Sequence, residues 1–269
     1  MTSCKSCPVN NQLTHMGINL EKYDRLVTLA GNPNTGKSSL FNALTGLKQH
    51  TGNWPGKTVT RAEGGFIYKG ARYKLVDLPG TYSLLSTSQE EEIARDFILF
   101  ARPDCTIVVV DATALERNLN LVFQVLEITD KAVVCVNLMD EARRKGLEVD
   151  VRSLSRHLGV PAVPTVARTG EGVYDLISAV AGVVQEEIQT APRHPPLPPQ
   201  VADAVEELVS LVERLVPGLP NARWVAYRLL EGDHRVRQAL LSGELTRQVT
   251  PRRAPSRQPS PKIALEDAQ

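Results

Sequence analysis

The sequence predicts an α/β domain with a mostly parallel sheet, followed by a small all-α domain. Short apolar, β-branched runs alternate with helical patterns from residue 25 to residue 188. A turn rich in glycine and asparagine follows the first run directly, and five prolines in residues 191–199 end the alternation. Only helical patterns follow these prolines. Alternating strands and helices form a parallel sheet covered on both faces, with ligands at the carboxyl ends of its strands.

The expected strands are of two kinds. Residues 105–110 and 132–136 are continuous apolar runs, as in strands buried on both faces. Two further runs flank the turn at Gly70 and indicate a hairpin, which gives the sheet one antiparallel edge. The expected strands, in chain order, are residues 26–30, 61–68, 72–76, 105–110, 132–136 and 162–166.

The chain divides into four parts. Residues 1–22 are polar without sustained periodicity, so we expect a flexible N-terminal tail. Residues 23–190 form the α/β domain, residues 191–199 a semi-rigid proline-rich linker, and residues 200–269 the helical domain, with a Pro/Arg-rich segment near its end, at 251–262. The expected helices are one that begins near Lys37 and residues 90–101, 118–129, 141–145, 173–188, 201–215, 222–230 and 234–241.

Composition narrows the class of protein. The 269 residues are 42% apolar and 23% charged, which is ordinary for a globular protein. A net charge of +1 argues against nucleic acid as a partner. We expect a cytosolic chain, because no apolar run approaches the roughly 18 residues of a membrane span and no signal pattern opens the sequence. Among the four cysteines, Cys105 and Cys135 lie in apolar runs and are expected in the core.

The turn after the first strand has the form G-x-x-x-x-G-K-[ST], between a strand and a helix, and predicts a P-loop NTPase fold. Small residues let successive backbone N–H groups converge on phosphate oxygens, and the helix N-terminus adds its positive end. Lys37 would reach the β- and γ-phosphates, and the Ser38 hydroxyl would coordinate Mg²⁺. The expected phosphate-binding residues are Gly31, Asn32, Pro33, Asn34, Thr35, Gly36, Lys37, Ser38 and Ser39.

Two downstream segments are predicted to sense the terminal phosphate. Asp77, at a strand end, would hold Mg²⁺ through water, and Gly80 would bring its N–H to the γ-phosphate. Residues 51–60 show no helical or strand pattern and predict a mobile loop whose Thr58, or second Thr60, gives a hydroxyl to Mg²⁺. Trp54 in this loop is either a core anchor or a ligand contact. The contact residues expected from the two segments are Gly56, Lys57, Thr58, Val59, Thr60, Asp77, Leu78, Pro79 and Gly80.

A third motif follows the strand at residues 132–136 and predicts a guanine site. The Asp140 carboxylate can accept hydrogen bonds from guanine N1–H and N2–H₂, whereas adenine offers neither donor. Asn137 would brace the neighbouring loops, and the N–H near Ala167 would meet guanine O6. The residues expected at the base are Asn137, Leu138, Met139, Asp140, Thr165, Val166 and Ala167. With the phosphate motifs they predict a Ras-like G domain that binds GTP and GDP.

The stretches GNPNTGKSSLFNALTG, GNWPGKTV and VDLPGTYSL together resemble the G domain of bacterial ferrous iron transport protein B. The helical segment with ARW and RLLEGD is similar to that family's second cytosolic domain, so the resemblance covers about residues 24 to 245. Lys57 is a departure, because the family usually has a small apolar residue there.

The resemblance implies a GTPase fused to an Fe²⁺ permease at the cytoplasmic face of the bacterial inner membrane, with this chain alone soluble. It also implies K⁺-stimulated hydrolysis, with Asn34 and the backbone oxygens of Gly52 and Trp54 as K⁺ ligands, and a helical domain that tunes nucleotide release. We expect slow hydrolysis, with Lys37, Asn34, Thr58 and Gly80 as catalytic groups, because Thr81 stands where many small GTPases have a water-orienting glutamine. The transporter's membrane domain is the expected partner, and a homo-oligomer is left open.

Two other functions remain open at this point: an NTPase motor with poor base selectivity, and a binding switch with negligible turnover. Cys4-x-x-Cys7 has metal-ligand spacing, but a reduced disordered tail is favoured because a tetrahedral site needs four ligands. The carboxylates at residues 90–92 are expected to be the solvated start of a helix after Ser88 rather than a metal-sensing patch. The five histidines are scattered and predict no catalytic site.

Overall fold

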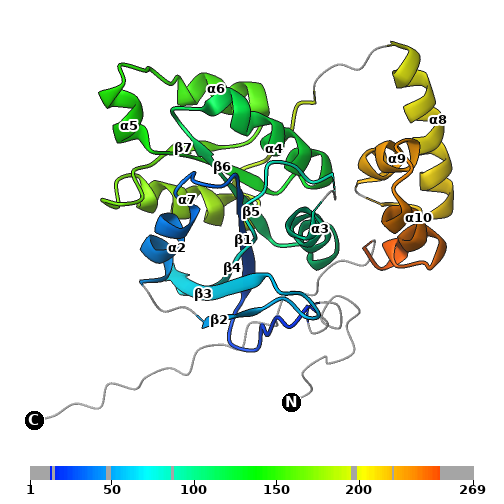
Figure 1. Ribbon diagram of the computed structural model, residues 1–269, viewed down its shortest axis with the longest axis horizontal. Helices are drawn as coiled ribbons and strands as arrows, with labels where there is room; N and C mark the ends of the chain where they lie inside the picture. Colours follow the sequence, from blue (N-terminus) through cyan, green and yellow to red (C-terminus); the bar gives the residue numbers. More distant parts are fainter. Residues whose placement is uncertain are drawn as a thin grey trace, which may run out of the picture.

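A computed structural model describes residues 13, 16–46, 50–85, 88–194, 199–219 and 221–248 (Figure 1). A seven-stranded sheet with helices on both faces forms the larger part, and a group of helices lies beside it (Figure 1). This arrangement confirms the predicted α/β domain followed by helices. Within the described ranges, no helix has both the length and the apolar character that a membrane span requires.

The sheet has the strand order β2-β3-β4-β1-β5-β6-β7. The β1, β4, β5, β6 and β7 pairings are parallel, whereas β3 runs antiparallel to both β2 and β4. The hairpin and the mostly parallel sheet are therefore confirmed. The strands are β1 Arg25–Gly31, β2 His50–Asn53, β3 Thr60–Tyr68, β4 Ala71–Asp77, β5 Cys105–Asp111, β6 Ala132–Asn137 and β7 Ala162–Pro164.

The helices follow the expected order with two additions, α6 and the 3₁₀-helix η2, and the helix expected at residues 90–101 is divided into α3 and the π-helix η1. The N-cap of α6 is Asp150, which accepts a hydrogen bond from the Ser153 N–H at 2.8 Å. The sequence of α6 does carry helix signals, a cap residue followed by Val151, Leu154 and Leu158 at helical spacing, which the prediction left out. The helices are α2 Lys37–Thr45, α3 Gln89–Asp96, the π-helix η1 Phe97–Ala101, α4 Leu115–Ile128, α5 Met139–Arg144, α6 Val151–Leu158, α7 Val173–Val184, α8 Pro199–Leu215, α9 Ala222–Leu230, α10 His234–Leu241 and the 3₁₀-helix η2 Leu245–Gln248.

Two hydrophobic clusters cover the two faces of the sheet. One lies between the sheet and helices α2 and α7, and it includes the buried Cys105 and Cys135. The other lies under α3 and α4 and continues into the helical domain, where Trp224 is 2% exposed. The shared apolar cluster holds the helical domain against the α3–α4 face of the sheet (Figure 1).

The segment expected as a flexible tail is in part packed. Ile18 is 3% exposed within the α3–α4 cluster, and its N–H donates to the Leu13 carbonyl at 2.8 Å. Arg61 on β3 donates to the backbone oxygens of Met16 and Gly17. Leu13 and Ile18 are therefore buried, although they are too few and too far apart to form a periodic pattern in the sequence. Cys4, Cys7 and the Pro/Arg-rich segment 251–262 lie outside the described residues.

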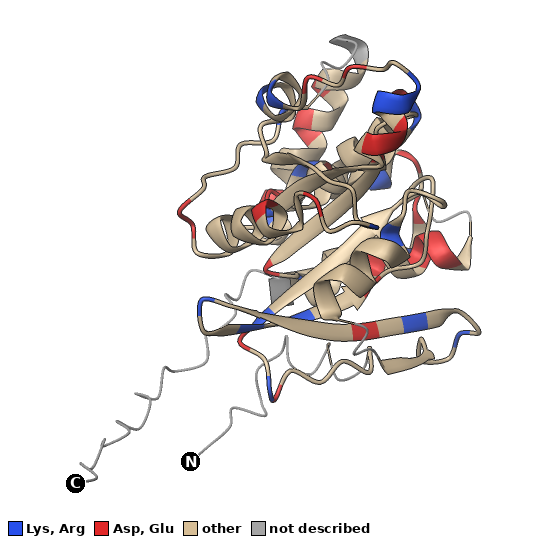
Figure 2. Cartoon of the chain, turned by 90° about the vertical axis from the view of Figure 1, so that its left-hand side faces the viewer, with Lys and Arg blue, Asp and Glu red and all other residues tan. Residues whose placement is uncertain are grey.

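Figure 2 shows Lys and Arg interspersed with Asp and Glu over the elements of the sheet domain that it draws. The overall charge of +1 agrees with this mixture. No large surface of one charge sign dominates the part that Figure 2 draws, so the electrostatics of the site depend on individual ion pairs.

Candidate functional site

The loop between β1 and α2 is held in a conformation that needs its glycines. Gly36 has φ 79°, and a Cβ there would lie 2.3 Å from the Asn137 side-chain nitrogen. A Cβ at Gly31 would lie 2.7 Å from the Val109 carbonyl oxygen. Asn34 is exposed and also has a positive φ, 65°, which asparagine tolerates better than most residues. The loop therefore curls tightly at the carboxyl end of the sheet.

Lys37 and Asp77 meet across this loop although 40 residues separate them. The Lys37 Nζ lies 2.6 Å from Asp77 Oδ1 and 2.6 Å from the Leu78 carbonyl oxygen. Burial raises the pKa of Asp77, and the charge of Lys37 opposes that rise. Ser38 and Ser39 are exposed in the first turn of α2. The predicted phosphate lysine, the serine hydroxyl and the strand-end carboxylate thus share one end of the sheet.

The segment after Asp77 lies along the phosphate loop. The Thr81 N–H donates to the Gly31 carbonyl at 3.2 Å, and a Cβ at Gly80 would come within 3.5 Å of Pro33. The Thr81 side chain is 4% exposed, and its hydroxyl donates to the Ser83 carbonyl at 2.7 Å. Thr81 therefore stabilises its own turn, and its hydroxyl is already engaged.

The segment 51–60, predicted as a mobile loop, is partly a strand, so the prediction is wrong where β2 and β3 include its ends. Residues 50–53 form β2, and Gly52 pairs with Arg61 of the antiparallel neighbour β3. Thr60 opens β3, while Thr58 is exposed in the connecting turn. Cross-strand hydrogen bonds stabilise β2 in spite of its glycine and its polar composition, which concealed it in the sequence. Among the described residues, no hydrogen bond joins the Thr58 or Thr60 side chain to the phosphate loop.

Trp54 is the core anchor of this turn. It is 5% exposed, and its ring meets Phe97 edge-on with centroids 5.4 Å apart. Its backbone N–H donates to the Val59 carbonyl, and its backbone carbonyl accepts from the Lys57 N–H, both at 3.0 Å. The indole therefore fixes the turn, which leaves the exposed residues between Trp54 and Val59 on the solvent side.

The acidic start of α3 makes specific contacts. Lys57 forms an ion pair with Glu92 at 2.8 Å, and the Ser83 hydroxyl donates to Glu91 at 2.8 Å. Ser88 caps the helix by accepting from the Glu91 N–H at 3.2 Å. Two of the three carboxylates thus connect α3 to the turn after β2 and to the segment after β4. The sequence signal that was available was the departure at Lys57, a cation that needs a partner.

Asn137 joins the loop between β1 and α2 (the predicted phosphate loop, residues 31–38) to the loop after β7 (the predicted base loop, residues 165–170). Its side-chain nitrogen donates to the Thr35 carbonyl at 2.9 Å. Its Oδ1 accepts from the Ala167 N–H at 3.0 Å and from the Thr165 hydroxyl at 3.2 Å. Asn137 is 1% exposed, so these bonds are shielded from water. Asn137 therefore connects the two loops, as predicted. One of its hydrogen bonds uses the Ala167 N–H, which was expected to meet guanine O6.

Asp140 stands in the first turn of α5 beside this brace, after Leu138 with φ 62°. Its side chain is 25% exposed, and its Oδ2 lies 3.3 Å from Arg168 Nη2 and 3.9 Å from Arg144 Nη2. Burial raises the pKa of Asp140, but hydrogen bonds from the Glu141 N–H and from Arg168 outweigh it, and the pKa falls below its ordinary value. The carboxylate is therefore ionised at neutral pH, as acceptance of two N–H donors requires.

Comparison with known proteins agrees with this geometry. Residues 25–180 match the family model described as ferrous iron transport protein B. The chain belongs to the ferrous iron transport protein B family. It is 39% identical over 212 residues to the Fe(2+) transporter FeoB of Shigella flexneri and 40% identical over 215 residues to that of Salmonella typhimurium. These alignments cover 77% of this chain and 27% of each relative, so the chain spans about a quarter of their length.

Solved structures of FeoB share the fold. The cytosolic domain of L. pneumophila FeoB is 33% identical with a TM-score of 0.73, covering 83% of this chain and 88% of that one. The cytosolic domain of T. maritima FeoB in a GDP form is 38% identical with a TM-score of 0.73, covering 81% and 84%. An S. thermophilus NFeoB mutant bound to GDP is 36% identical with a TM-score of 0.73, covering 84% and 86%.

Proposed function

We propose that this chain is the GTP-binding, slowly GTP-hydrolysing regulatory region of a ferrous iron transporter, joined to a membrane domain at the cytoplasmic face of the inner membrane. The observation that carries the proposal is Asn137, which ties the Thr35 carbonyl of the phosphate loop to Ala167 of the base loop. Phosphate and base elements are thus one site. Titration with a fluorescent GDP analogue tests it, and failure of saturable binding would contradict it.

The residues divide the chemistry between them. Lys37 binds β- and γ-phosphate oxygens as a point charge, and the backbone N–H groups of residues 34–38 surround the β-phosphate. Asp77, whose pKa Lys37 keeps from rising further, stays available as an acceptor at the strand end. Gly80 presents its N–H to the γ-phosphate from a backbone packed on Pro33. Water then attacks the phosphorus in line, with the leaving diphosphate held by the phosphate loop.

The donor set fits two cations. An exposed Ser38 hydroxyl and the Asp77 carboxylate are hard oxygen ligands of the kind that Mg²⁺ prefers, and Thr58 is the third candidate. For K⁺ the candidates are the exposed Asn34 amide oxygen and the carbonyls of Gly52 and Trp54. When bound, these cations would supply positive charge to the phosphoryl oxygens as the transition state forms.

Hydrolysis is expected to be faster in K⁺ than in Na⁺. Na⁺ is the smaller ion, so it fits less well among amide and carbonyl oxygens that are spaced for K⁺. Single-turnover GTP hydrolysis in matched KCl and NaCl measures this, with Asn34→Ala as the variant that should abolish the difference. Equal rates in the two salts would remove K⁺ from the proposal and leave the GTPase assignment in place.

Thr81→Ala is expected to keep GTP hydrolysis within about tenfold of wild type, a barrier change below roughly 1.4 kcal/mol. The reason is that the Thr81 hydroxyl already donates to the Ser83 carbonyl at 2.7 Å within a buried turn. Thr81→Ser, which keeps that bond, is the matched control. A larger loss in Thr81→Ala under single-turnover conditions would show that Thr81 positions the attacking water.

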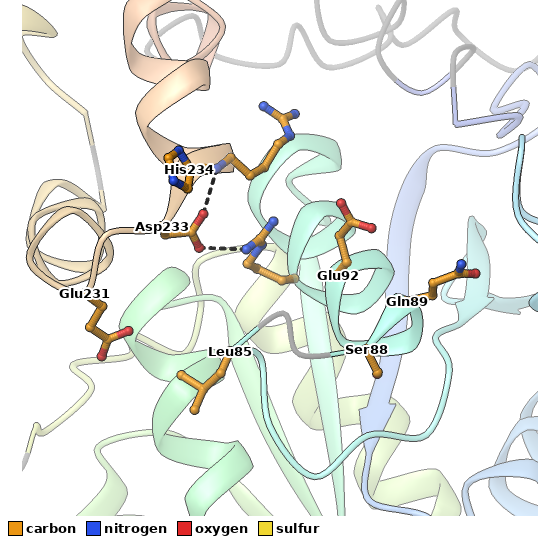
Figure 3. Close-up of a pocket in the computed structure, with 9 residues that line it drawn as sticks. Leu85, Ser88, Gln89, Glu92, Glu231, Asp233 and His234 are labelled. Atoms are coloured by element: carbon orange, nitrogen blue, oxygen red, sulfur yellow. Dashed lines mark hydrogen bonds and ion pairs between the residues drawn. The ribbon is translucent and has the colours of Figure 1, made fainter.

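The helical domain is proposed to tune nucleotide release through its contact with α3. A pocket of about 520 Å³ lies between the two, lined by Leu85, Ser88 and Gln89 on one side and by Glu231 and His234 on the other (Figure 3). Asp233 accepts a hydrogen bond there from Arg95 Nη1 at 2.8 Å (Figure 3). Because α3 follows the segment that meets the γ-phosphate, this ion pair supports a mechanical link between nucleotide state and helical domain.

A further inference from the structure

Arg168 is a site residue that the predicted motifs do not include. It follows Ala167 in the loop after β7, with a side chain 78% exposed, and its Nη2 lies 3.3 Å from Asp140 Oδ2. No other ion pair of Arg168 occurs among the residues the structure describes. The nearby Arg144 lies further from Asp140, at 3.9 Å, and also pairs with Glu141. The base-reading carboxylate therefore has one dedicated arginine.

The loop that carries Arg168 is braced on both sides. The Ala167 N–H is held by Asn137, and the N–H groups of Thr169 and Gly170 both donate to the Val166 carbonyl at 3.0 Å. Val166 also forms a β-bridge with Glu171. Arg168 thus sits at the tip of a tight turn whose ends are fixed. Its backbone is held next to Asp140, while most of its side chain is exposed to solvent.

The arginine head group resembles the guanine edge that Asp140 is expected to bind. Guanine presents N1–H and N2–H₂ as neighbouring donors in one plane, and a guanidinium presents neighbouring N–H donors in the same way. Asp140 Oδ2 is one of only two acceptor atoms on that carboxylate. Each carboxylate oxygen can accept more than one hydrogen bond, so the competition is chiefly for the charge of Asp140: a base that reaches Oδ2 meets an anion that Arg168 already partly neutralises.

We propose that Arg168 is an internal competitor of guanine for Asp140, which lowers the affinity of the site for guanine nucleotides and so favours their release. This inference rests on the proposed guanine-nucleotide site. Arg168 stabilises the free carboxylate, so the base binds to an anion whose charge is already partly compensated. The net gain from the base is thereby reduced.

Arg168→Ala is expected to bind GDP more tightly, by about two- to fivefold, the range expected for an exposed ion pair. Equilibrium titration with a fluorescent GDP analogue measures the change. The gain should shrink at high salt, because salt screens the ion pair that is lost. Arg168→Lys keeps the charge without the planar pair of donors and should fall between wild type and Arg168→Ala.

Arg144→Ala is the matched control, because it removes the same charge from the same neighbourhood. It should leave GDP affinity unchanged or slightly weaker, since a general loss of positive charge disfavours an anionic ligand. A second control is Arg168→Ala in an Asp140→Asn background, titrated with xanthosine diphosphate. The gain should disappear there, because a neutral amide forms no ion pair with Arg168.

The outcomes separate this inference from the function on which it rests. Unchanged or weaker GDP binding by Arg168→Ala would overturn the competitor role, and weaker binding would place Arg168 on the bound base instead. A gain of equal size in Arg144→Ala would also overturn it, because the effect would then be one of general charge. If neither wild type nor any variant bound GDP, the proposed function and this inference would both fail.

Discussion

Asp140→Asn is expected to weaken GDP binding by about a hundredfold, the discrimination that one good bidentate contact supplies, and to raise the affinity for xanthosine diphosphate. The ionised carboxylate accepts both guanine donors, whereas an asparagine side chain offers one acceptor and one donor. Xanthine carries an oxygen in place of the guanine amino group, so it matches the amide. Competition of each diphosphate against a fluorescent GDP analogue measures both changes in one series.

Glu141→Gln is the control for Asp140→Asn. It neutralises the adjacent carboxylate, which pairs with Arg144 on the surface of α5, and should leave base preference unchanged. ATP should compete weakly with the analogue on the wild-type protein and no more weakly on Asp140→Asn. Strong ATP competition on the wild type would favour an NTPase with poor base selectivity. A GDP affinity that survived Asp140→Asn would move the base site elsewhere.

The sequence was most informative where chemistry restricts residue type. The turn from Gly31 to Ser38 requires glycines at fixed places, and the structure shows why, since a Cβ at Gly36 would collide with the Asn137 side chain. That contact also links two motifs that lie far apart in the chain. Buried strands such as β5 and β6 were equally predictable, because a short, continuous, β-branched apolar run is typical of a strand covered on both faces.

The sequence was least informative where tertiary contacts decide the structure. Strand β2 has the sequence HTGN and forms only because β3 offers it an edge. The packed segment around Ile18 depends on a cluster made by distant residues. Arg168 is hard to predict for a related reason: a lone exposed arginine carries no pattern until its partner is known. Its role follows from the 3.3 Å contact with Asp140.

Arg95→Met is expected to lower the free energy of unfolding by about 3–5 kcal/mol, the usual cost of removing one partner from a buried ion pair. Arg95 is 1% exposed and joins Asp96 to Asp233 of the helical domain through hydrogen bonds of 2.9 and 2.8 Å. Without it, both carboxylates lose their nearest cation. Urea denaturation followed by circular dichroism measures the loss, and Arg156→Met on the exposed face of α6 should change stability by less than about 0.5 kcal/mol.

The loss in Arg95→Met should depend on pH. Burial raises the pKa of Asp96, and the charges of Arg95 and Arg235 oppose that rise. A carboxyl whose pKa is higher in the folded state than in the unfolded state contributes stability at low pH and loses it as pH rises through the folded pKa. Removal of Arg95 raises the pKa of Asp96 further, so the deficit should be largest at neutral pH and smaller toward pH 4. A deficit that is constant with pH would mean that lost packing, rather than unpaired charge, causes it.

The same variant tests whether stability and regulation share this contact. Asp233 also caps α10 by accepting from the Arg235 and Val236 N–H groups, so Asp233→Asn keeps an oxygen for the cap while it removes the charge. If the ion pair links α3 to the helical domain, Arg95→Met and Asp233→Asn should change the GDP dissociation rate in the same direction, and the double variant should add little to either. Two variants that lose stability yet release GDP at the wild-type rate would show that the pair holds the domains together without transmitting nucleotide state.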